Sequence, residues 1–544
     1  MTKKKRNKII ISICIIVIVI ILMGIKIAPQ YIISELKEGQ IENQVQMQYD
    51  KTKYTNTRQK LNIDQFKKVI ESMSEERYKQ ILKLVNNATI EDIHKLYNEK
   101  KFTCEELVTF YLKRIAQYDV NKLNSIIELN SDAIVLARQF DRGLNKGKLQ
   151  GIPVMLKGNI GTNDRMNTTA GAAALSNLVV KQDAFIATKL RKEGAIILGK
   201  TNLSEWAYYM SSNAPSGYSA LGGQTHNAYG KFDVGGSSSG AAVAISANLA
   251  TVSIGTETAG SIIYPSSQNS VVGMKPSLGL VSRNGIIPLT TAQDTAGIIT
   301  KNVEDAMLVL KVITGYDKED PVTAESRKIN ISPTNYAKND SIKGIKIAVV
   351  KSSLRKEDNE ILKKVEKELS NMGVKVTHTS FYKDVRKKMN TETALSCGFK
   401  IDVNKYLNKN NVKGIRNLQD IVNFNKKDLK NRAPYGQNLL EEALNNKTTT
   451  KQWEKIVKDN REVAGNAIDS VLKDSDVILS ISNDISDIYA AAGYPAITIP
   501  VGYKSTGDPI GITLIASKFQ EDKLFWIANY YENNTHHRKD AVLK

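Results

Sequence analysis

The stretch Val234 to Ser261, VGGSSSGAAVAISANLATVSIGTETAGS, sets two serine-containing glycine turns around one helix and one strand. The first turn is GGSSSG and the second is GTETAGS. Between them, AAVAISANLA has a helical composition, and Thr251 to Ile254 is a short apolar run typical of a buried strand. Glycines permit left-handed backbone and close approach of other groups. A serine hydroxyl is a weak nucleophile until a base takes its proton, so the pattern raises the question of where that base is.

The GGSSSG run has other interpretations. A Gly/Ser run is most often a flexible linker or a plain turn, but this one lies between apolar segments. A phosphate loop would need Gly-Lys-Ser/Thr after the glycines, which is absent. A nucleophile elbow, G-x-S-x-G, would centre on Ser238, yet the preceding NAYGKFDV is polar and turn-like rather than a strand. The elbow also needs a later histidine, for which only His378, His536 and His537 are available.

The segment Gly235 to Asp305, which contains GGSSSGAAVAIS, GTETAGSIIYPSS and SRNGIIPLTTAQDTAG, resembles the amidase signature family of serine hydrolases, and its peptide-amidase-like branch in particular. The likeness extends upstream through Gly151 to Ile160 and Glu193 to Ala207. It resumes at Ala492 to Tyr503 and Pro509 to Ala516. The resemblance implies an α/β amidase signature fold, in which helices cover both faces of a mixed central β-sheet.

Lys157 is the candidate base, because it ends the apolar run Val154 to Leu156 and precedes a glycine turn. A lysine held among apolar groups is costly to keep charged, so its pKa falls. At an unperturbed pKa of ~10.4, only about one lysine in 2,500 is neutral at pH 7. The resemblance implies that Lys157 is the catalytic base. The family commonly has Asp at the next position, where this chain has Gly158, and we interpret this as a change in local support.

The resemblance also implies the roles of the two turns. Ser261 corresponds to the nucleophile, and Ser237 to the serine that bridges lysine and nucleophile, with a cis Gly236–Ser237 peptide bond. The oxyanion hole would be formed by the backbone N–H groups of Thr258, Ala259, Gly260 and Ser261. Residue 259 is usually glycine in the family, so its methyl group is expected to narrow the hole or the acyl pocket. Asp294 is expected to hold loops through backbone hydrogen bonds.

Composition adds bounds on partners and cofactors. The chain has 544 residues and a formal net charge of +20, but its lysines are spread and it has no nucleic-acid motif, so no nucleic-acid partner is expected. Anionic lipid or cell-wall polymers fit the charge better, and a general bias toward Lys, Ile and Asn fits it equally. Five scattered histidines without CxxC or HExxH spacing predict no metal site, and no cofactor is expected. The cysteines Cys14, Cys104 and Cys397 do not form a disulfide framework.

An apolar run, Ile9 to Ile25, follows a basic N-terminus and precedes Lys26. Seventeen helical residues span roughly 25 Å, which is near the short limit for a bilayer core. Basic residues remain cytoplasmic, so the run predicts a single-pass signal anchor with the catalytic domain outside the cell membrane. A cleaved signal peptide, giving a secreted protein, is the alternative, but MGIKIAPQ offers no A-x-A-like site.

These features predict five segments. Residues 1–27 form the basic flank and transmembrane anchor, and 28–87 form a stalk and leading helix. Residues 88–315 form the catalytic core, 476–544 form its C-terminal part, and 316–475 form a variable insert. Within the insert, a β-α-β pattern is expected to extend the sheet, and a mostly helical part follows it. In similar enzymes such an insert lines the substrate entrance.

The resemblance therefore implies a serine amidase with a Ser-cisSer-Lys triad. It would hydrolyse a carboxamide, either a small molecule or the C-terminal amide of a peptide, to acid and ammonia through an acyl-enzyme. A glutaminase-type subunit of a tRNA-dependent amidotransferase is the first alternative. The second is a surface binding protein that keeps the fold without turnover. The sequence leaves the oligomeric state open.

Overall fold

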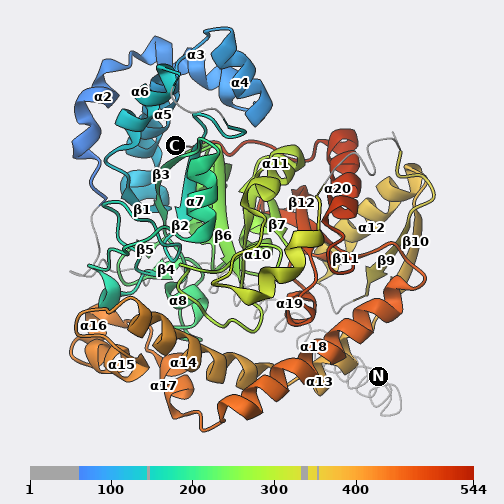
Figure 1. The fold of residues 1–544 in the computed structure, drawn as a ribbon. Coiled ribbons are helices and arrows are strands. Elements are labelled where there is room, and N and C mark those ends of the chain that lie inside the picture. Colours follow the sequence, from blue (N-terminus) through green and yellow to red (C-terminus); the bar gives the residue numbers. More distant parts are fainter. Residues whose placement is uncertain (1–60, 144–146, 332–340, 352–354, 544) are drawn as a thin grey trace, which may run out of the picture. The chain divides into compact units, whose positions relative to one another are not determined.

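The computed structural model describes residues 61–143, 147–331, 341–351 and 355–543. Within these residues an eleven-stranded mixed sheet forms the centre of the fold (Figure 1). In spatial order its strands are β1 (Ile126–Leu129), β3 (Ile196–Thr201), β2 (Pro153–Lys157), β6 (Val252–Glu257), β8 (Thr295–Thr300), β7 (Val272–Lys275), β12 (Ala496–Tyr503), β13 (Pro509–Ile515), β11 (Val477–Ile481), β9 (Lys346–Val350) and β10 (Lys375–Thr379). A separate hairpin pairs β4 (Tyr218–Ser219) with β5 (Gly223–Gln224).

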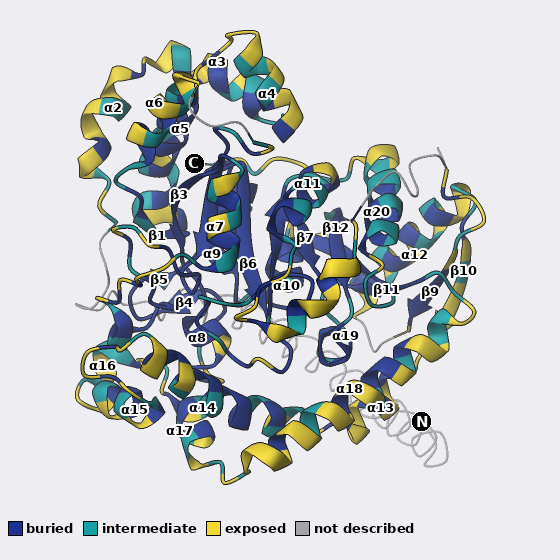
Figure 2. Ribbon diagram, viewed as in Figure 1, coloured by how far each residue is buried: buried dark blue, intermediate teal, exposed yellow. Residues whose placement is uncertain are grey.

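Strands β2 and β6 lie side by side in parallel and are buried along their whole length, as their apolar runs predict (Figure 2). Their register pairs Leu156 with Ile254, so the carboxyl ends of both strands meet at one edge of the sheet. Lys157 ends β2, and the TETAGS turn begins at the end of β6. This register therefore brings the candidate base to the second serine turn.

Helices pack against the sheet in two groups. Helix α9 (Ser239–Ser246) contacts β2, β3, β6 and β8, and it also meets α10 (Ile263–Gln268), which lies against β7, β12 and β13. A second group consists of α7 (Phe185–Lys192), α11 (Val303–Ile313) and α20 (Glu521–Thr535), in which α11 contacts the other two. The absence of a side chain at Gly240 lets the start of α9 approach the segment before β1, because a Cβ atom there would lie 2.2 Å from the Ser125 carbonyl oxygen.

The remaining helices precede β1, connect strands in the first half of the chain, or follow β9. The N-terminal helices and the short helix beside the hairpin are α2 (Lys67–Ser72), α3 (Glu75–Val85), α4 (Ile90–Asn98), α5 (Cys104–Arg114), α6 (Ala133–Asp141) and α8 (Glu205–Tyr208). Those that follow β9 are α12 (Lys356–Asn371), α13 (Tyr382–Lys388), α14 (Thr391–Lys409), α15 (Leu418–Lys426), α16 (Leu429–Arg432), α17 (Asn438–Asn445), α18 (Thr450–Leu472) and α19 (Ser486–Ala492). Short 3-10 or π segments are η1 (Asp64–Phe66), η2 (Ile115–Leu123), η3 (Ala173–Leu175) and η4 (Pro321–Lys328).

The predicted β-α-β unit is present as β9, α12 and β10. It extends the sheet because β9 pairs in parallel with both β10 and β11. Helices α14 to α18 form a separate layer beyond one end of the strands, drawn in orange in Figure 1. Helix α14 contacts α15, α17 and α18 within this layer.

The predicted membrane anchor requires correction. Its segment, residues 9–25, lies outside the described residues, and in the part of the chain that the structure describes no helix is both long and apolar enough to cross a membrane. A membrane span needs about 20 mostly apolar residues. Helix α18 has 23 residues but reads TKQWEKIVKDNREVAGNAIDSVL, with charges throughout. The transmembrane helix, the signal anchor, the membrane partnership and the single-pass localisation are therefore withdrawn, while the mixed α/β sheet is confirmed.

Candidate active site

Lys157 is fully buried at the end of β2 and makes three close polar contacts. Its Nζ donates to Ser237 Oγ at 2.7 Å, to Thr256 Oγ1 at 2.9 Å and to the Thr256 carbonyl oxygen at 3.1 Å. Burial lowers the pKa of Lys157 to about 7, although the charges of Asp294 and Glu257 act in the opposite direction. Near pH 7 the amine of Lys157 is therefore neutral in a substantial fraction of the molecules.

Burial alone does not identify this lysine. Lys200 and Lys275 are also fully buried, and burial lowers the pKa of each to about 8. Lys200 donates to the Ile160 carbonyl, and Lys275 to the carbonyls of Pro276 at 3.0 Å and Tyr494 at 2.8 Å. Backbone carbonyls cannot pass on a proton, whereas a serine hydroxyl can. Lys157 is distinguished by its contact with Ser237.

The GGSSSG loop needs its glycines. A Cβ atom at Gly235, where φ is +65°, would lie 2.6 Å from Pro265 Cα, and one at Gly236 would lie 2.5 Å from Ser204 Oγ. The Gly236–Ser237 peptide bond is cis, as the family resemblance implies. This tight loop places Ser237, which is fully buried, against the amine of Lys157.

The Ser238 hydroxyl is used in structural hydrogen bonds, so the interpretation of GGSSSG as a nucleophile elbow is wrong. Its Oγ donates to the Thr256 carbonyl at 3.0 Å and accepts from Thr256 N at 3.2 Å, and the residue is fully buried. The described strand that precedes it, β5, ends at Gln224, so Ser238 does not follow a strand directly. Its hydroxyl fastens the first serine turn to β6.

Ser261 lies on the turn between β6 and α10 and is 7% exposed. The two serine turns are joined by a hydrogen bond from Ser238 N to the Ser261 carbonyl at 3.0 Å. The structure thus brings Lys157 and Ser237 into direct contact and sets Ser261 on the adjoining turn. Among the hydrogen bonds of the described residues, none joins the hydroxyls of Ser237 and Ser261.

The turn that contains Ser261 presents free amide groups. Strand β6 ends at Glu257, and none of the next four backbone N–H groups donates to another described residue. These are the groups of Thr258, Ala259, Gly260 and Ser261. Backbone N–H groups without a protein partner are able to donate to an oxygen that carries negative charge.

Glu257 supports this turn, although no motif in the sequence marks it. Its carboxylate accepts from Ile262 N at 2.8 Å, from Ile263 N at 3.0 Å and from Tyr489 OH at 3.0 Å, and the residue is 1% exposed. It therefore fixes the chain immediately after Ser261. Its sequence signal is weak, namely one acidic residue at the end of an apolar strand.

Asp294 holds the other side of the turn, as expected. Its carboxylate accepts from Thr258 Oγ1 at 2.6 Å and from the backbone N–H groups of Leu289 and Thr290 at 2.8 and 2.9 Å. Burial raises the pKa of Asp294 to about 7. This residue links the loop that precedes β8 to the first of the four free amides.

Close packing around position 158 explains why glycine follows Lys157. A Cβ atom at Gly158 would lie 2.8 Å from Ile127 Cδ1 and 3.1 Å from the Thr201 carbonyl oxygen. An aspartate would not fit here without movement of these groups. Asn159 supports the Lys157 site instead. Its Nδ2 donates to Thr256 Oγ1 at 3.1 Å, which orients the threonine that contacts Lys157.

A cavity of about 270 Å³ lies beside the residues that support Lys157 and beside the free-amide turn. Its lining includes Asn159 and Thr256, which support Lys157, and Thr258 of the free-amide turn. The other side consists of the loop 283–291 and of residues Asp402, Lys405, Tyr406 and Lys409 on α14. The insert therefore contributes a wall of the cavity next to the candidate site.

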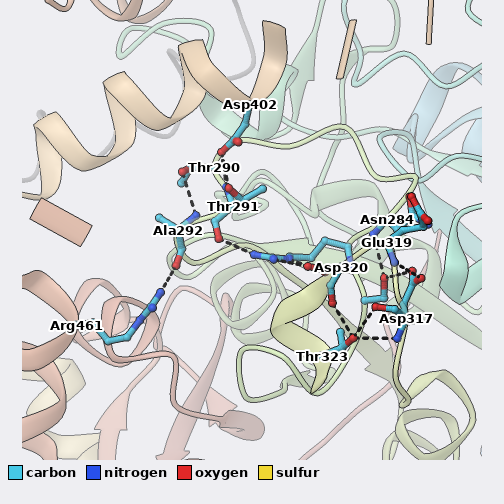
Figure 3. A network of polar contacts seen from close by, with 12 residues as sticks. Asn284, Thr290, Thr291, Ala292, Asp317, Glu319, Asp320, Thr323, Asp402 and Arg461 are labelled. Atoms are coloured by element: carbon cyan, nitrogen blue, oxygen red, sulfur yellow. Dashed lines mark hydrogen bonds and ion pairs between the residues drawn. The ribbon is translucent and has the colours of Figure 1, made fainter. Parts of the chain in front are cut away.

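Figure 3 shows the polar contacts that hold the loop 283–294 on two sides. On one side Arg283 donates to Asp320 through Nε at 2.9 Å and Nη2 at 2.6 Å. On the other side Asp402 of α14 accepts from Thr291 N at 2.6 Å and from its Oγ1 at 2.9 Å. Arg461 of α18 donates to the Ala292 carbonyl at 2.6 Å. The loop that carries Asp294 is therefore anchored on two insert helices.

In the ranges that the structure describes, no group of three or more His, Cys, Asp or Glu side chains is placed to hold a metal ion. The two described cysteines, Cys104 and Cys397, are buried and free.

Known proteins match this chain in sequence over most of its length. The sequence pattern of the Amidase family matches residues 106–483. An Arabidopsis thaliana protein named as a probable amidase is 36% identical over 474 residues, covering 84% of this chain and 91% of its own. A glutamyl-tRNA(Gln) amidotransferase subunit from Lactobacillus johnsonii is 30% identical over 478 residues, covering 82% of this chain and 96% of its own.

Two solved structures share the fold. The crystal structure of an amidase family protein from Bacillus anthracis has a TM-score of 0.83 at 35% identity, and the match covers 91% of this chain and 98% of that one. Native peptide amidase from Stenotrophomonas maltophilia has a TM-score of 0.77 at 34% identity, and the match covers 84% of this chain and 99% of that one.

Proposed function

This chain belongs to the amidase signature family and is a hydrolase that acts on amide bonds, and from this premise we propose that it hydrolyses a carboxamide through an acyl-enzyme on Ser261. The substrate would be a small-molecule amide or the C-terminal amide of a peptide. The similarity to a protein named peptide amidase supports the second class.

The observation that carries the proposal is the 2.7 Å contact between Lys157 Nζ and Ser237 Oγ, in a site that lowers the pKa of the amine to about 7. A neutral Lys157 takes the Ser237 proton as Ser237 takes the proton of Ser261. Catalytic hydrogen bonds are often long before substrate binds, so we expect the two hydroxyls to approach in the substrate complex. Ser261 Oγ then bonds to the amide carbon.

The carbonyl oxygen becomes an oxyanion in this step, and the free N–H groups of residues 258–261 stabilise it. Loss of one such donor costs about 3–4 kcal/mol in other acyl-transfer enzymes. The protonated lysine returns its proton through Ser237 to the leaving nitrogen, and the C–N bond breaks to release ammonia. Water, deprotonated by the same relay, attacks the ester, and the acid leaves with Ser261 restored.

The test is ammonia release by the purified chain from a panel of amides, including peptide amides, aliphatic amides and glutamine, with Ser261→Ala as control. Hydrolysis by the wild type and none by the variant is the expected result. Hydrolysis of glutamine alone would favour the glutaminase alternative, to which the relatives named as glutamyl-tRNA(Gln) amidotransferase subunits correspond. No ammonia from any amide, with an amide still bound, would favour the binding-protein alternative.

A further inference from the structure

Three polar side chains in the wall of the cavity have an oxygen without a partner among the described residues. Asn159, Asp402 and Tyr406 all line the cavity and are 2%, 6% and 8% exposed. Asn159 Oδ1 and the Tyr406 hydroxyl are buried without any hydrogen-bond partner. Asp402 uses Oδ2 for both contacts with Thr291, and its Oδ1 accepts from no described residue. Buried polar groups are nearly always paired, so the two unpaired oxygens of Asn159 and Tyr406 in one cavity need an explanation.

The placement of these oxygens divides the cavity into two ends. Asn159 lies at the reaction end, because its Nδ2 donates to Thr256 Oγ1, the partner of Lys157. Asp402 and Tyr406 lie at the insert end, four residues apart on α14 and therefore on one side of that helix. A ligand that reaches from one end to the other would meet acceptor atoms at both.

We propose that Asp402 and Tyr406 form a specificity-determining subsite for an amino group on the substrate, whose carboxamide reacts at Ser261. This inference rests on the proposed function and names its substrate class as amides with an amino group on the acyl part. An ammonium has three N–H donors and no acceptor, which matches a free carboxylate oxygen beside a free hydroxyl oxygen. The Asn159 oxygen would meet a second N–H group, that of the carboxamide.

No described cationic side chain is in salt-bridge contact with the Asp402 carboxylate, although the charges of Arg283 and Lys405 act on it and lower its pKa against the effect of burial. Asp402 forms no salt bridge with a described residue, whereas Arg283 is engaged by Asp320 and Lys409 Nζ donates to Asn284 Oδ1 at 3.2 Å. Lys405 is exposed on the rim. Figure 3 shows Asp402 extending from α14 to the Thr291 loop with no cationic side chain joined to it. A buried carboxylate with no cation in direct contact is costly, and a bound ammonium relieves that cost.

The size of the cavity limits the substrate. A volume of about 270 Å³ lies just below the usual range for small-molecule sites, so the acyl chain must be short. A short amino-substituted alkanamide would place its two nitrogens at opposite ends of the cavity. The acyl chain length that gives the highest kcat/KM should therefore reflect the distance between Ser261 and Asp402.

The experiment compares kcat/KM for two series of matched chain length, ω-aminoalkanamides and unsubstituted alkanamides. The wild type should favour the amino series at one chain length. Asp402→Asn should lower kcat/KM for that amino amide at least about tenfold more than it lowers kcat/KM for the alkanamide, as expected for loss of a charged hydrogen bond. Tyr406→Phe should act in the same direction with a smaller effect. Asp384→Asn removes an exposed carboxylate on α13 and serves as the matched control.

Two outcomes would overturn the inference: equal kcat/KM for both series in the wild type, or an equal loss for both series in Asp402→Asn. The second would mean that Asp402 only holds the Thr291 loop. If the wild type hydrolyses no amide, the proposed function fails, and calorimetric titration of the amino series decides the subsite separately. Binding that weakens in Asp402→Asn would support it, and unchanged or absent binding would refute it.

Discussion

The Nζ atom of Lys157 lies 2.7 Å from the Oγ atom of Ser237, and both residues are fully buried. Among the described residues the amine has no carboxylate partner within hydrogen-bonding distance, because its other contacts are with Thr256. Burial therefore dominates and lowers the pKa of Lys157. A lysine that loses its proton near neutral pH and contacts a serine hydroxyl can act as a base.

The pH dependence of the reaction follows from that pKa. Since the neutral amine is the active form, kcat/KM should rise as pH increases through about 7 and then level off. The measurement is a pH profile of kcat/KM with the best amide of the panel. Asp294 also titrates near 7, so the profile of Asp294→Asn is the control, and its ascending limb should persist. A limb that vanishes in that variant would assign the titration to Asp294.

Covalent labelling tests the nucleophile. A serine-directed phosphonate should label the wild type at Ser261, and Ser261→Ala should abolish the label. Ser237→Ala should slow labelling by a factor of about 10² or more, because general-base assistance contributes about that much. Mass spectrometry of the labelled peptide reads the site. Label that persists on another serine in Ser261→Ala would contradict the assignment.

Ser238 should affect stability rather than chemistry. Ser238→Ala removes a buried hydroxyl that bonds both the N–H and the carbonyl of Thr256, so the free energy of unfolding should fall by about 1–3 kcal/mol. Denaturant titration measures this loss. The folded variant should still be labelled at Ser261, and loss of label without loss of stability would revive the elbow interpretation.

Much of this architecture can be predicted from the sequence, since apolar runs coincide with buried strands. The runs at 149–156 and 251–254 overlap β2 and β6, and the β-α-β pattern after residue 344 is β9, α12 and β10. The contact between Lys157 and Ser237 is predicted only by family resemblance, because these residues are 80 apart in sequence and meet where the GGSSSG loop packs on β6, which lies beside β2 in the sheet. Local patterns contain no information on that packing.

The supporting residues could not be predicted for a related reason. Glu257 and Asp402 are ordinary acidic residues in the sequence, and their importance depends on which N–H groups the fold brings to them. Asp402 in particular lies in a helical insert whose contact with the 283–294 loop has no local signal. The membrane prediction failed differently, since it relied on residues 9–25, and no described helix offers a span.

The protonation of Asp294 should change stability with pH. Its pKa is raised to about 7 from a usual value near 4, so between these values the folded state binds more protons than the unfolded state. The contribution of Asp294 to the free energy of unfolding is then fully present below about pH 4 and is lost as pH rises toward 7. Asp294→Asn cannot titrate, so the stability of the wild type relative to this variant should decline across that window.

The measurement is the free energy of unfolding of both proteins by denaturant titration at several values between about pH 4 and 8. Taking the difference cancels other buried carboxyls whose pKa burial also raises, such as Glu128 and Glu532, because both proteins contain them. Asparagine keeps one oxygen for the N–H groups of Leu289 and Thr290, so the loop should remain attached. A difference that stays constant with pH would mean that Asp294 is ionised throughout, with Thr258 and the loop amides outweighing its burial.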